Sequence, residues 1–195
     1  MATGVAVRLY RSNFRHILML ETAHPLAVRR RVSFCEAVYE KCVDVEGIEA
    51  IRVVGEDETQ AAWNAGKIAV RVDPRAESVA SCKPDVLIDA ILAKRNCGTT
   101  ISDAPLVVAL GPGFRAGEDC HVVIETNRGH NLGRLIVSGA AEANTGIPGN
   151  INGHTTERVL RAPAVGVFNT NRQIGELVRK GDLIGQIGSN RVSAN

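Results

Sequence analysis

The sequence predicts an α/β protein in which a mostly parallel sheet is followed by β structure. In the first hundred residues, short apolar runs alternate with helical patterns, which is typical of βαβ units. Apolar residues make up 45% of the chain and aromatic residues only 4%, so a core of Ala, Val, Ile and Leu is expected, as in parallel sheets. Beyond residue 100, Gly-rich turns replace the helices. We therefore predict an α/β domain over residues 1–100 and a β-rich domain over residues 101–195.

In the first domain the apolar spacing predicts alternating helices and strands. Residues 5–10 have a helical pattern, and residues 16–21 form a short apolar run that ends on an acid, as in a buried strand. Pro25 suits the first turn of a second helix whose apolar stripe ends at Phe34 and Val38. Further strands are predicted at 50–54, 68–72 and 86–92, with a short helix from Glu56 that ends at Gly66.

The second domain is expected to consist of short strands and turns. Residues 143–156 are polar and rich in Gly and Asn, which is typical of a loop. The apolar runs of this domain predict β segments at 106–110, 121–125, 135–137, 159–163, 165–168 and 183–187.

Composition excludes several functional classes. The 23 basic and 21 acidic residues give a net charge of +2, which offers no electrostatic basis for binding nucleic acid or an anionic membrane. No apolar run approaches the roughly 18 residues of a membrane span, and the first residues lack a signal-peptide pattern. Five cysteines without Cys-x-x-Cys spacing argue against disulfides and a thiolate zinc site. A reduced, cytoplasmic protein is expected.

The first candidate site is a nucleotide site near the start of the chain. Glu21 ends the strand after the first helix, where an acid bonds the ribose hydroxyls in dinucleotide-binding folds. Gly4 is the candidate glycine of the phosphate turn, and Arg30 is a candidate phosphate ligand. The alternative is that Glu21 is a solvated strand end and that Arg29, Arg30 and Arg31 form a solvated helix face.

The second candidate site follows the strand that contains Asp89. Because the carboxyl ends of strands line the ligand crevice in open α/β sheets, Asp89, Asn96 and Thr99 are expected to bind a cofactor there. Lys94 and Cys97 lie in the same turn and are candidate catalytic residues. The alternative is a buried Asp that caps a neighbouring turn beside a surface Lys.

The third candidate site is the polar segment between two apolar runs at 125–134. Glu125, Asn127, Arg128 and Arg134 are candidate substrate ligands of a cleft shared with the turn after Asp89. His130 is a candidate acid–base group. The alternative is an ordinary polar loop. No metal is expected, because the histidines and acids lack the spacing of a metal site.

Several unusual segments together resemble one family, the YqeB-type accessory proteins of the selenium-dependent molybdenum hydroxylase system. These segments cover residues 2–12, 27–39, 85–94, 111–114, 125–133 and 144–149. The resemblance implies a bacterial, cytoplasmic protein with a Rossmann-like fold, distantly similar to XdhC-like maturation factors. Members usually carry a strand and a Gly-rich turn before the part that matches Met1 to Gly4. Both are expected to be missing here, so the resemblance implies an incomplete Rossmann-like sheet.

The end of the chain has a second resemblance. Residues 161–168 and 174–185 are similar to half of a biotinyl/lipoyl-type barrel-sandwich domain. The modified Lys of those domains lies beside Met in another hairpin, whereas Lys180 precedes a Gly-Asp turn. A barrel-sandwich-like architecture without covalent biotin or lipoate is therefore expected.

These observations favour a maturation factor for selenium-dependent molybdenum hydroxylases, whose partner is the hydroxylase or its maturation machinery. A nucleotide or cofactor precursor is its expected ligand, bound in a cleft between the two domains. Two alternatives stay open: an NAD(P)-dependent oxidoreductase that uses His130 or Lys94 as proton donor, and a non-catalytic protein-interaction module.

Overall fold

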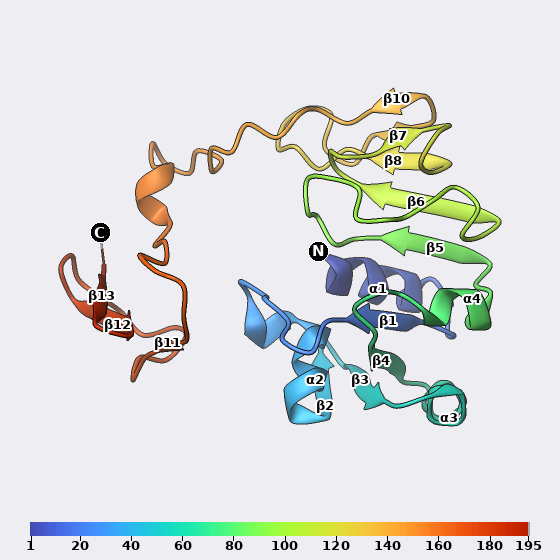
Figure 1. Cartoon of the computed structure of the whole chain (residues 1–195), viewed down its shortest axis with the longest axis horizontal. Helices are drawn as coiled ribbons and strands as arrows, with labels where there is room; N and C mark the ends of the chain where they lie inside the picture. The colour runs from blue at the N-terminus through green and yellow to red at the C-terminus, as the bar shows by residue number, and fades with distance from the viewer. Residues whose placement is uncertain (195) are drawn as a thin grey trace. The chain divides into compact units, whose positions relative to one another are not determined.

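The structure is a computed structural model that describes residues 1–194 (Figure 1). The chain forms two compact units, which divide between Ala143 and Asn144. The domain boundary predicted near residue 100 lies inside the first unit, between β5 (Val86–Asp89) and β6 (Leu106–Leu110). These two strands pair in parallel in one sheet, so the first unit extends well beyond that boundary.

The first sheet of unit 1 is mixed but mostly parallel, in the order β1-β4-β3-β2. Both β1 and β3 run parallel to β4, and β2 closes the outer edge as an antiparallel hairpin with β3. The strands are β1 (Leu18–Glu21), β2 (Cys42–Val45), β3 (Ile48–Val53) and β4 (Ile68–Val72).

Helices cover both faces of this sheet, which explains its apolar strands. On one face, Ala6 and Val7 of α1 (Ala2–Arg11) belong to the same buried cluster as Ile68 and Val70. On the other face, Ala62 of α3 (Glu56–Asn64) packs with Val53 and Ala69. Alternate residues of β4 therefore enter two separate cores.

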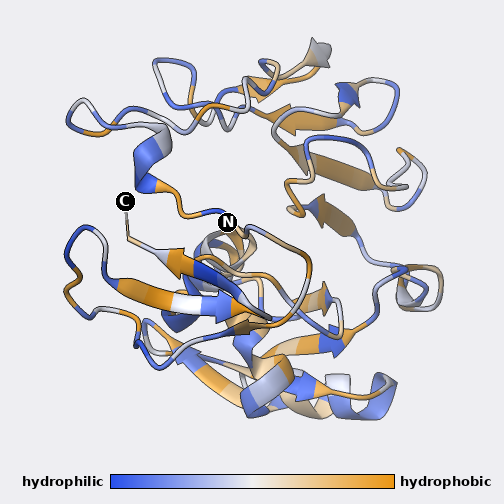
Figure 2. Ribbon diagram, turned by 60° about the vertical axis from the view of Figure 1, so that its left-hand side comes forward, coloured by the Kyte–Doolittle hydropathy of each residue, from blue (hydrophilic) through white to orange (hydrophobic). Residues whose placement is uncertain are grey.

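The second sheet of unit 1 has the order β5-β6-β8-β9. Strands β5, β6 and β8 are parallel, and β9 pairs antiparallel with β8. Val107, Ala109 and Val123 lie in its buried core, and Figure 2 shows these strands as mainly apolar ribbon. The remaining elements are α4 (Ser78–Cys82), β8 (Val122–Ile124), β9 (Leu135–Ile136) and the antiparallel pair β7 (Arg115–Ala116) and β10 (Gly139–Ala140).

The second unit contains one small antiparallel sheet in the order β11-β12-β13. Among its described apolar side chains, Ile187 and Val192 are buried. No closed barrel is formed by the described residues. Its elements are η3 (Thr156–Arg158), β11 (Phe168–Asn169), β12 (Leu183–Ile187) and β13 (Asn190–Ser193).

The strand and helix positions in the first unit agree closely with the sequence patterns, but the helix predicted from Pro25 is wrong. The chain instead forms two 3-10 turns, η1 (Arg30–Val32) and η2 (Phe34–Glu36), and the one-turn helix α2 (Ala37–Glu40). Leu26 is 98% exposed and Val28 97% exposed, so this segment has no apolar face that would stabilise a longer helix.

Three predicted strands also differ from the structure. The strand predicted at 165–168 coincides with β11 only at Phe168. The strand predicted at 86–92 ends at Asp89, because the Asp89 side chain accepts a hydrogen bond from the backbone of Ile91 and turns the chain. No strand forms at 159–163. Val159 and Leu160 are exposed, so this apolar run has no sheet to join.

Candidate functional site

Polar side chains gather where the parallel strands of unit 1 end. Glu21 is the last residue of β1, Asp89 is the last residue of β5, and Glu125 follows directly after β8. Ligands of open α/β sheets bind outside the carboxyl ends of the strands. The carboxyl edges of the two sheets are therefore the candidate sites.

The first helix points its N-terminal end at the carboxyl edge of the first sheet. The Tyr10 hydroxyl, near the end of α1, donates to the carbonyl of Gly66, just before β4. At the start of α1, the Thr3 hydroxyl accepts a hydrogen bond of 3.0 Å from the backbone N–H of Phe34, which is fully buried. The positive end of the helix dipole thus lies on the same side of the sheet as Glu21.

Glu21 is a half-buried carboxyl group with spare hydrogen-bonding capacity. The Glu21 carboxylate accepts a hydrogen bond of 3.3 Å from the backbone N–H of Thr22. Burial raises the pKa of Glu21 above its ordinary value, and the Thr22 bond only partly opposes this shift. A carboxylate oxygen accepts more than one hydrogen bond, so Glu21 can still accept from a ligand hydroxyl.

Cys35 lies near Glu21 but is not activated. Burial raises the pKa of the Cys35 thiol, the contact with Ser33 lowers it, and the charge of Glu21 raises it further. The Ser33 hydroxyl lies 3.0 Å from the sulfur. A thiol with a raised pKa is a weak nucleophile at neutral pH, so Cys35 is a core residue of this edge.

Arg30 is already paired by another residue of its own segment. Its guanidinium donates two hydrogen bonds to Glu36, of 2.9 Å and 2.6 Å, and lies over the ring of Tyr39. A bidentate pair of this kind fixes the guanidinium, so Arg30 is committed to Glu36. Gly4 lies within α1, and a Cβ there would contact nothing within 4 Å.

The turn after β5 is organised by two polar side chains. Asp89, which is 5% exposed, accepts from the backbone of Ile91 and, at 2.7 Å, from the hydroxyl of Thr99. Asn96 accepts from the backbone N–H groups of Gly98 and Thr99 and donates to the Thr99 carbonyl. The structure thus brings Asp89, Asn96 and Thr99 together. Their hydrogen bonds stabilise the turn.

The two catalytic candidates of this turn have a different environment. Lys94 is exposed and has a left-handed backbone with φ of 63°. Cys97 is exposed as well, and its thiol donates to the carbonyl of Arg95 at 3.8 Å. Both side chains lie outside the hydrogen-bonded group of Asp89 and Asn96.

Glu125 is a buried carboxylate that closes the loop between β8 and β9. It is 3% exposed and accepts from the backbone of Asn127 at 2.7 Å and from the backbone of Glu142 at 2.8 Å. Burial opposes the charge of Glu125, but the backbone N–H groups outweigh it and lower the pKa of this carboxyl. The Asn127 side chain then donates to the Glu142 carboxylate.

The other candidates of this loop project from it. Arg128, His130 and Arg134 are all exposed. The backbone of Arg134 pairs with that of Glu125, since Glu125 donates to its carbonyl at 3.0 Å. The loop therefore presents two arginines and one histidine on a base that Glu125 fixes.

The turn after β6 holds the two polar loops close together. A Cβ on Gly111 would lie 2.5 Å from the Thr126 hydroxyl, and one on Gly113 would lie 2.5 Å from the backbone of Arg95. The strand register aligns Asp89 with Ala109, and Ala109 in turn with Val123. Two strand spacings then place Asp89 about 10 Å from β8, within the span of one ligand site.

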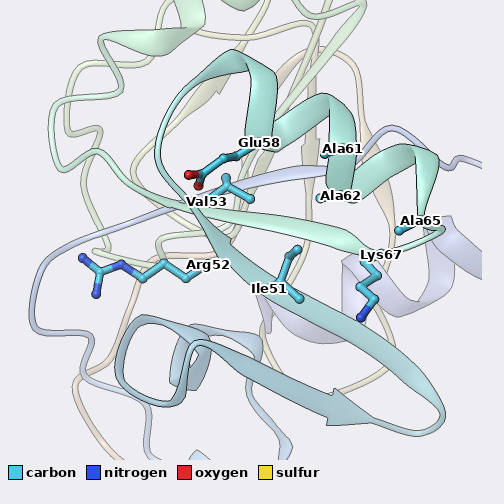
Figure 3. Close-up of a pocket in the computed structure, with 8 residues that line it drawn as sticks. All are labelled: Ile51, Arg52, Val53, Glu58, Ala61, Ala62, Ala65 and Lys67. Carbon is cyan, nitrogen blue, oxygen red and sulfur yellow. The ribbon is translucent and has the colours of Figure 1, made fainter.

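A cavity of about 310 Å³ lies elsewhere, between α3 and the end of β3 (Figure 3). The polar side chains at its rim already have partners within the protein. Lys67 forms an ion pair with Glu49 at 2.9 Å, and Glu58 accepts a hydrogen bond of 2.7 Å from the backbone N–H of Val54. None of the sequence-predicted site residues lines this cavity. Its lining consists of Ile51, Arg52, Val53, Glu58, Ala61, Ala62, Ala65 and Lys67.

Two other kinds of feature are absent from residues 1–194. No three His, Cys, Asp or Glu side chains gather in a way that would hold a metal ion. No helix in this range has both the length and the apolar character needed to cross a bilayer.

Two functional contacts have little sequence signal. Thr3 stands in an ordinary helical pattern, and its bond to Phe34 spans 31 residues. Glu142 stands 17 residues after Glu125, in a segment without a motif. The Gly-Pro-Gly turn at 111–113 does have a signal, since paired glycines indicate a backbone that needs close approach or positive φ.

The chain is similar to a curated bacterial protein. Over 194 residues, the chain is 48% identical to the uncharacterized protein YqeB of Escherichia coli (strain K12). The match covers 100% of this chain and 36% of the relative, so the chain spans about a third of the length of YqeB. The similarity to YqeB agrees with the YqeB-type resemblance of the six segments. No protein-family model matches the chain, and no solved structure matches it.

Proposed function

We propose that the chain is part of a cytoplasmic accessory protein for the maturation of selenium-dependent molybdenum hydroxylases, and that it binds a nucleotide. The YqeB-type resemblance of the six segments carries the maturation role, and the similarity to the uncharacterized protein YqeB agrees with that resemblance without bearing on the role itself. The second half treats unit 1 as a Rossmann-like unit, and the position of Glu21 supports it.

The observation that carries nucleotide binding is an acid with spare acceptor capacity at the end of β1. In Rossmann-like folds an acid at this position, one helix and one strand after the phosphate turn, bonds the ribose hydroxyls. Here α1 precedes β1 and Glu21 ends β1. Among residues 1–194, Thr22 is the one hydrogen-bond donor to the Glu21 carboxylate. Glu21 would accept hydrogen bonds from the 2′- and 3′-hydroxyls.

The residues fit the ribose better than the phosphates. The N-terminal end of α1 lies on the same side as Glu21 and favours an anion. Arg30, the expected phosphate ligand, is held by Glu36. We therefore assign recognition to the ribose hydroxyls, and we expect an unphosphorylated ribose to bind more tightly than a 2′-phosphate, which the Glu21 charge repels.

Titration calorimetry with NAD⁺, NADP⁺ and ATP tests nucleotide binding. We expect Glu21→Ala to weaken binding about tenfold or more, since a hydrogen bond to a charged group contributes about 1.5–3 kcal/mol. Glu40→Ala is the matched control, because Glu40 is an exposed carboxylate on the neighbouring helix α2. Nucleotide binding by Glu21 is contradicted if the unaltered chain does not bind, or if the Glu21 variant binds with equal affinity.

Gene deletion tests the maturation role separately. We expect deletion to lower selenium-dependent hydroxylase activity while the hydroxylase polypeptide is still produced. Restoring the gene with Glu21→Ala then shows whether nucleotide binding serves maturation. Full hydroxylase activity in the deletion strain contradicts the maturation role, whatever the calorimetry shows.

A second candidate function, a protein-interaction module, is favoured by the surface of unit 2. Val165 is fully exposed and Leu177 is 97% exposed, which leaves large apolar side chains in water. We expect Leu177→Ser combined with Val165→Ser to reduce co-purification with the hydroxylase without unfolding unit 1. Unchanged co-purification contradicts this candidate.

A further inference from the structure

The loop that follows β5 contains a row of backbone donors. None of the backbone N–H groups of residues 92–97 donates a hydrogen bond within residues 1–194. On one side of this row, the N–H of Ile91 donates to Asp89 at 3.1 Å. On the other side, the N–H of Gly98 donates to Asn96 at 2.8 Å. The donors between these two points are therefore available to a ligand.

Two residues of this row have a left-handed backbone, which residues with a side chain rarely adopt. Leu92 has a φ of 60° and Lys94 a φ of 63°, and Ala93 between them lies outside this region. Lys41 and Lys83 also have a positive φ, but they end the helices α2 and α4. A backbone that alternates between the two regions turns successive N–H groups toward one concave side, which binds anions.

The surrounding structure fixes the shape of this loop. Asp89 accepts from the start of the loop at Ile91 and from its end at Thr99. In the middle of the loop, the turn after β6 is so close that a Cβ on Gly113 would lie 2.5 Å from the backbone of Arg95. A strained backbone persists only where its surroundings enforce it, and such places cluster at ligand sites. Donors that are fixed in advance also lower the entropic cost of binding.

The side chains of the row add positive charge. Lys94 and Arg95 are exposed, and neither forms an ion pair within residues 1–194. The acid of this turn is Asp89, which is 5% exposed. One of its oxygens accepts from Ile91 and the other from Thr99. The exposed charge of this loop is therefore cationic.

We propose that residues 92–97 bind a phosphate group of a small molecule. Their backbone N–H groups donate to its oxygens, and Lys94 and Arg95 neutralise its charge. A phosphate group offers more acceptor oxygens than a carboxylate and suits a row of donors better. The loop leaves the carboxyl end of β5 (Figure 1), where ligands of parallel sheets bind. The site does not depend on nucleotide binding at Glu21.

Amide NMR spectra of the unaltered chain, titrated with sodium pyrophosphate, test the site. Sodium chloride at the same ionic strength is the reference. We expect the largest changes in amide shift at residues 92–97, and smaller ones at residues 29–31, which are three exposed arginines. Equal changes in the two segments, or the same changes with sodium chloride, overturn the proposal.

Two substitutions test the contribution of the charges. Lys94→Gln and Arg95→Gln should each weaken pyrophosphate binding about threefold or more, because each removes a charged hydrogen-bond donor. Lys83→Gln is the matched control, since Lys83 is an exposed lysine of the same unit with a φ of 44°. It should bind pyrophosphate as the unaltered chain does. Equal weakening by Lys83→Gln and Lys94→Gln overturns the site, because overall charge then explains the binding.

Titration with ADP identifies the source of the phosphate. If the phosphate belongs to a nucleotide at Glu21, ADP shifts the amides of residues 92–97, and Glu21→Ala weakens ADP binding but not pyrophosphate binding. If it belongs to another phosphorylated compound, pyrophosphate shifts these amides and ADP does not. Failure of ADP to bind thus contradicts nucleotide binding alone, whereas failure of pyrophosphate to shift residues 92–97 overturns the phosphate site.

Discussion

Glu21 and Glu125 occupy equivalent places in two neighbouring sheets, yet they have opposite electrostatics. Glu21 is the last residue of the parallel strand β1, and Glu125 directly follows the parallel strand β8. Glu125 accepts from two backbone N–H groups and has a lowered pKa, whereas Glu21 has one long bond to Thr22 and a raised pKa. The comparison teaches that a fully bonded buried carboxylate holds a loop, while an incompletely bonded one is available to a ligand.

The largest expected effect comes from removing the bonded carboxylate. Glu125→Ala leaves the N–H groups of Asn127 and Glu142 without their acceptor and should destabilise unit 1 by about 3 kcal/mol, measured by urea unfolding. Glu125→Gln keeps one acceptor oxygen and should cost less. Equal unfolding midpoints for the Ala variant and the unaltered chain would show that Glu125 does not hold the loop.

The pH dependence of the Glu125 variants has a defined sign. Because its pKa is lower in the folded chain, Glu125 stabilises the fold above the ordinary Glu pKa, and this contribution is lost as pH falls through the lowered value. The stability difference between Glu125→Gln and the unaltered chain should therefore shrink in acid. A difference that grows in acid contradicts the assignment.

The second effect tests the turn that joins the two polar loops. Gly113→Ala places a Cβ 2.5 Å from the backbone of Arg95 at a φ of 110°, and should cost about 3 kcal/mol in thermal or urea unfolding. Gly117→Ala is the matched control, with a φ of 89° and nothing within 4 Å of the added Cβ. Gly117→Ala should lower the free energy of unfolding by only about 1 kcal/mol. Equal losses for the two variants would mean that the positive φ alone, and not the close contact with Arg95, causes the destabilisation.

The third effect is smaller and concerns the turn after β5. Thr99→Val removes the hydroxyl that donates to Asp89 at 2.7 Å but keeps the side-chain shape. We expect a loss of about 1 kcal/mol in urea unfolding. Thr100→Val removes a hydroxyl that donates to Asp103 from the exposed residue Thr100 and should cost less. A larger cost for Thr100→Val than for Thr99→Val would show that the Thr99–Asp89 bond does not organise this turn.

The smallest effect has the opposite sign and belongs to Glu21. Since its pKa is raised in the folded chain, the charged form opposes folding at neutral pH, and this cost disappears as pH falls through the raised value. Glu21→Gln should therefore stabilise the chain slightly at pH 7, by about 0.5 kcal/mol or less, and not at acid pH. Destabilisation at pH 7 would mean that Glu21 is structural, as Glu125 is.

Much of the first unit follows from local patterns, but parts of the site do not. Short apolar runs predicted β1, β3, β4, β6 and β8, and the acidic start and glycine end of α3 predicted that helix. The helix predicted from Pro25 does not form, because the central residues of this segment are exposed arginines and apolar side chains without a packing partner. A local pattern cannot show whether another element will cover it.

Most strands of the first unit, the order of α1 before a strand, and the polar turns after Asp89 and Glu125 could be predicted from the sequence alone. These properties depend on neighbours in the chain, through apolar spacing and turn residues. Three features became visible only in the fold: β4 lies between β1 and β3, the backbone N–H of Glu142 donates to Glu125, and Glu21 keeps a free acceptor. The physical reason is that strand pairing and the burial of a carboxylate are set by residues far away in the sequence.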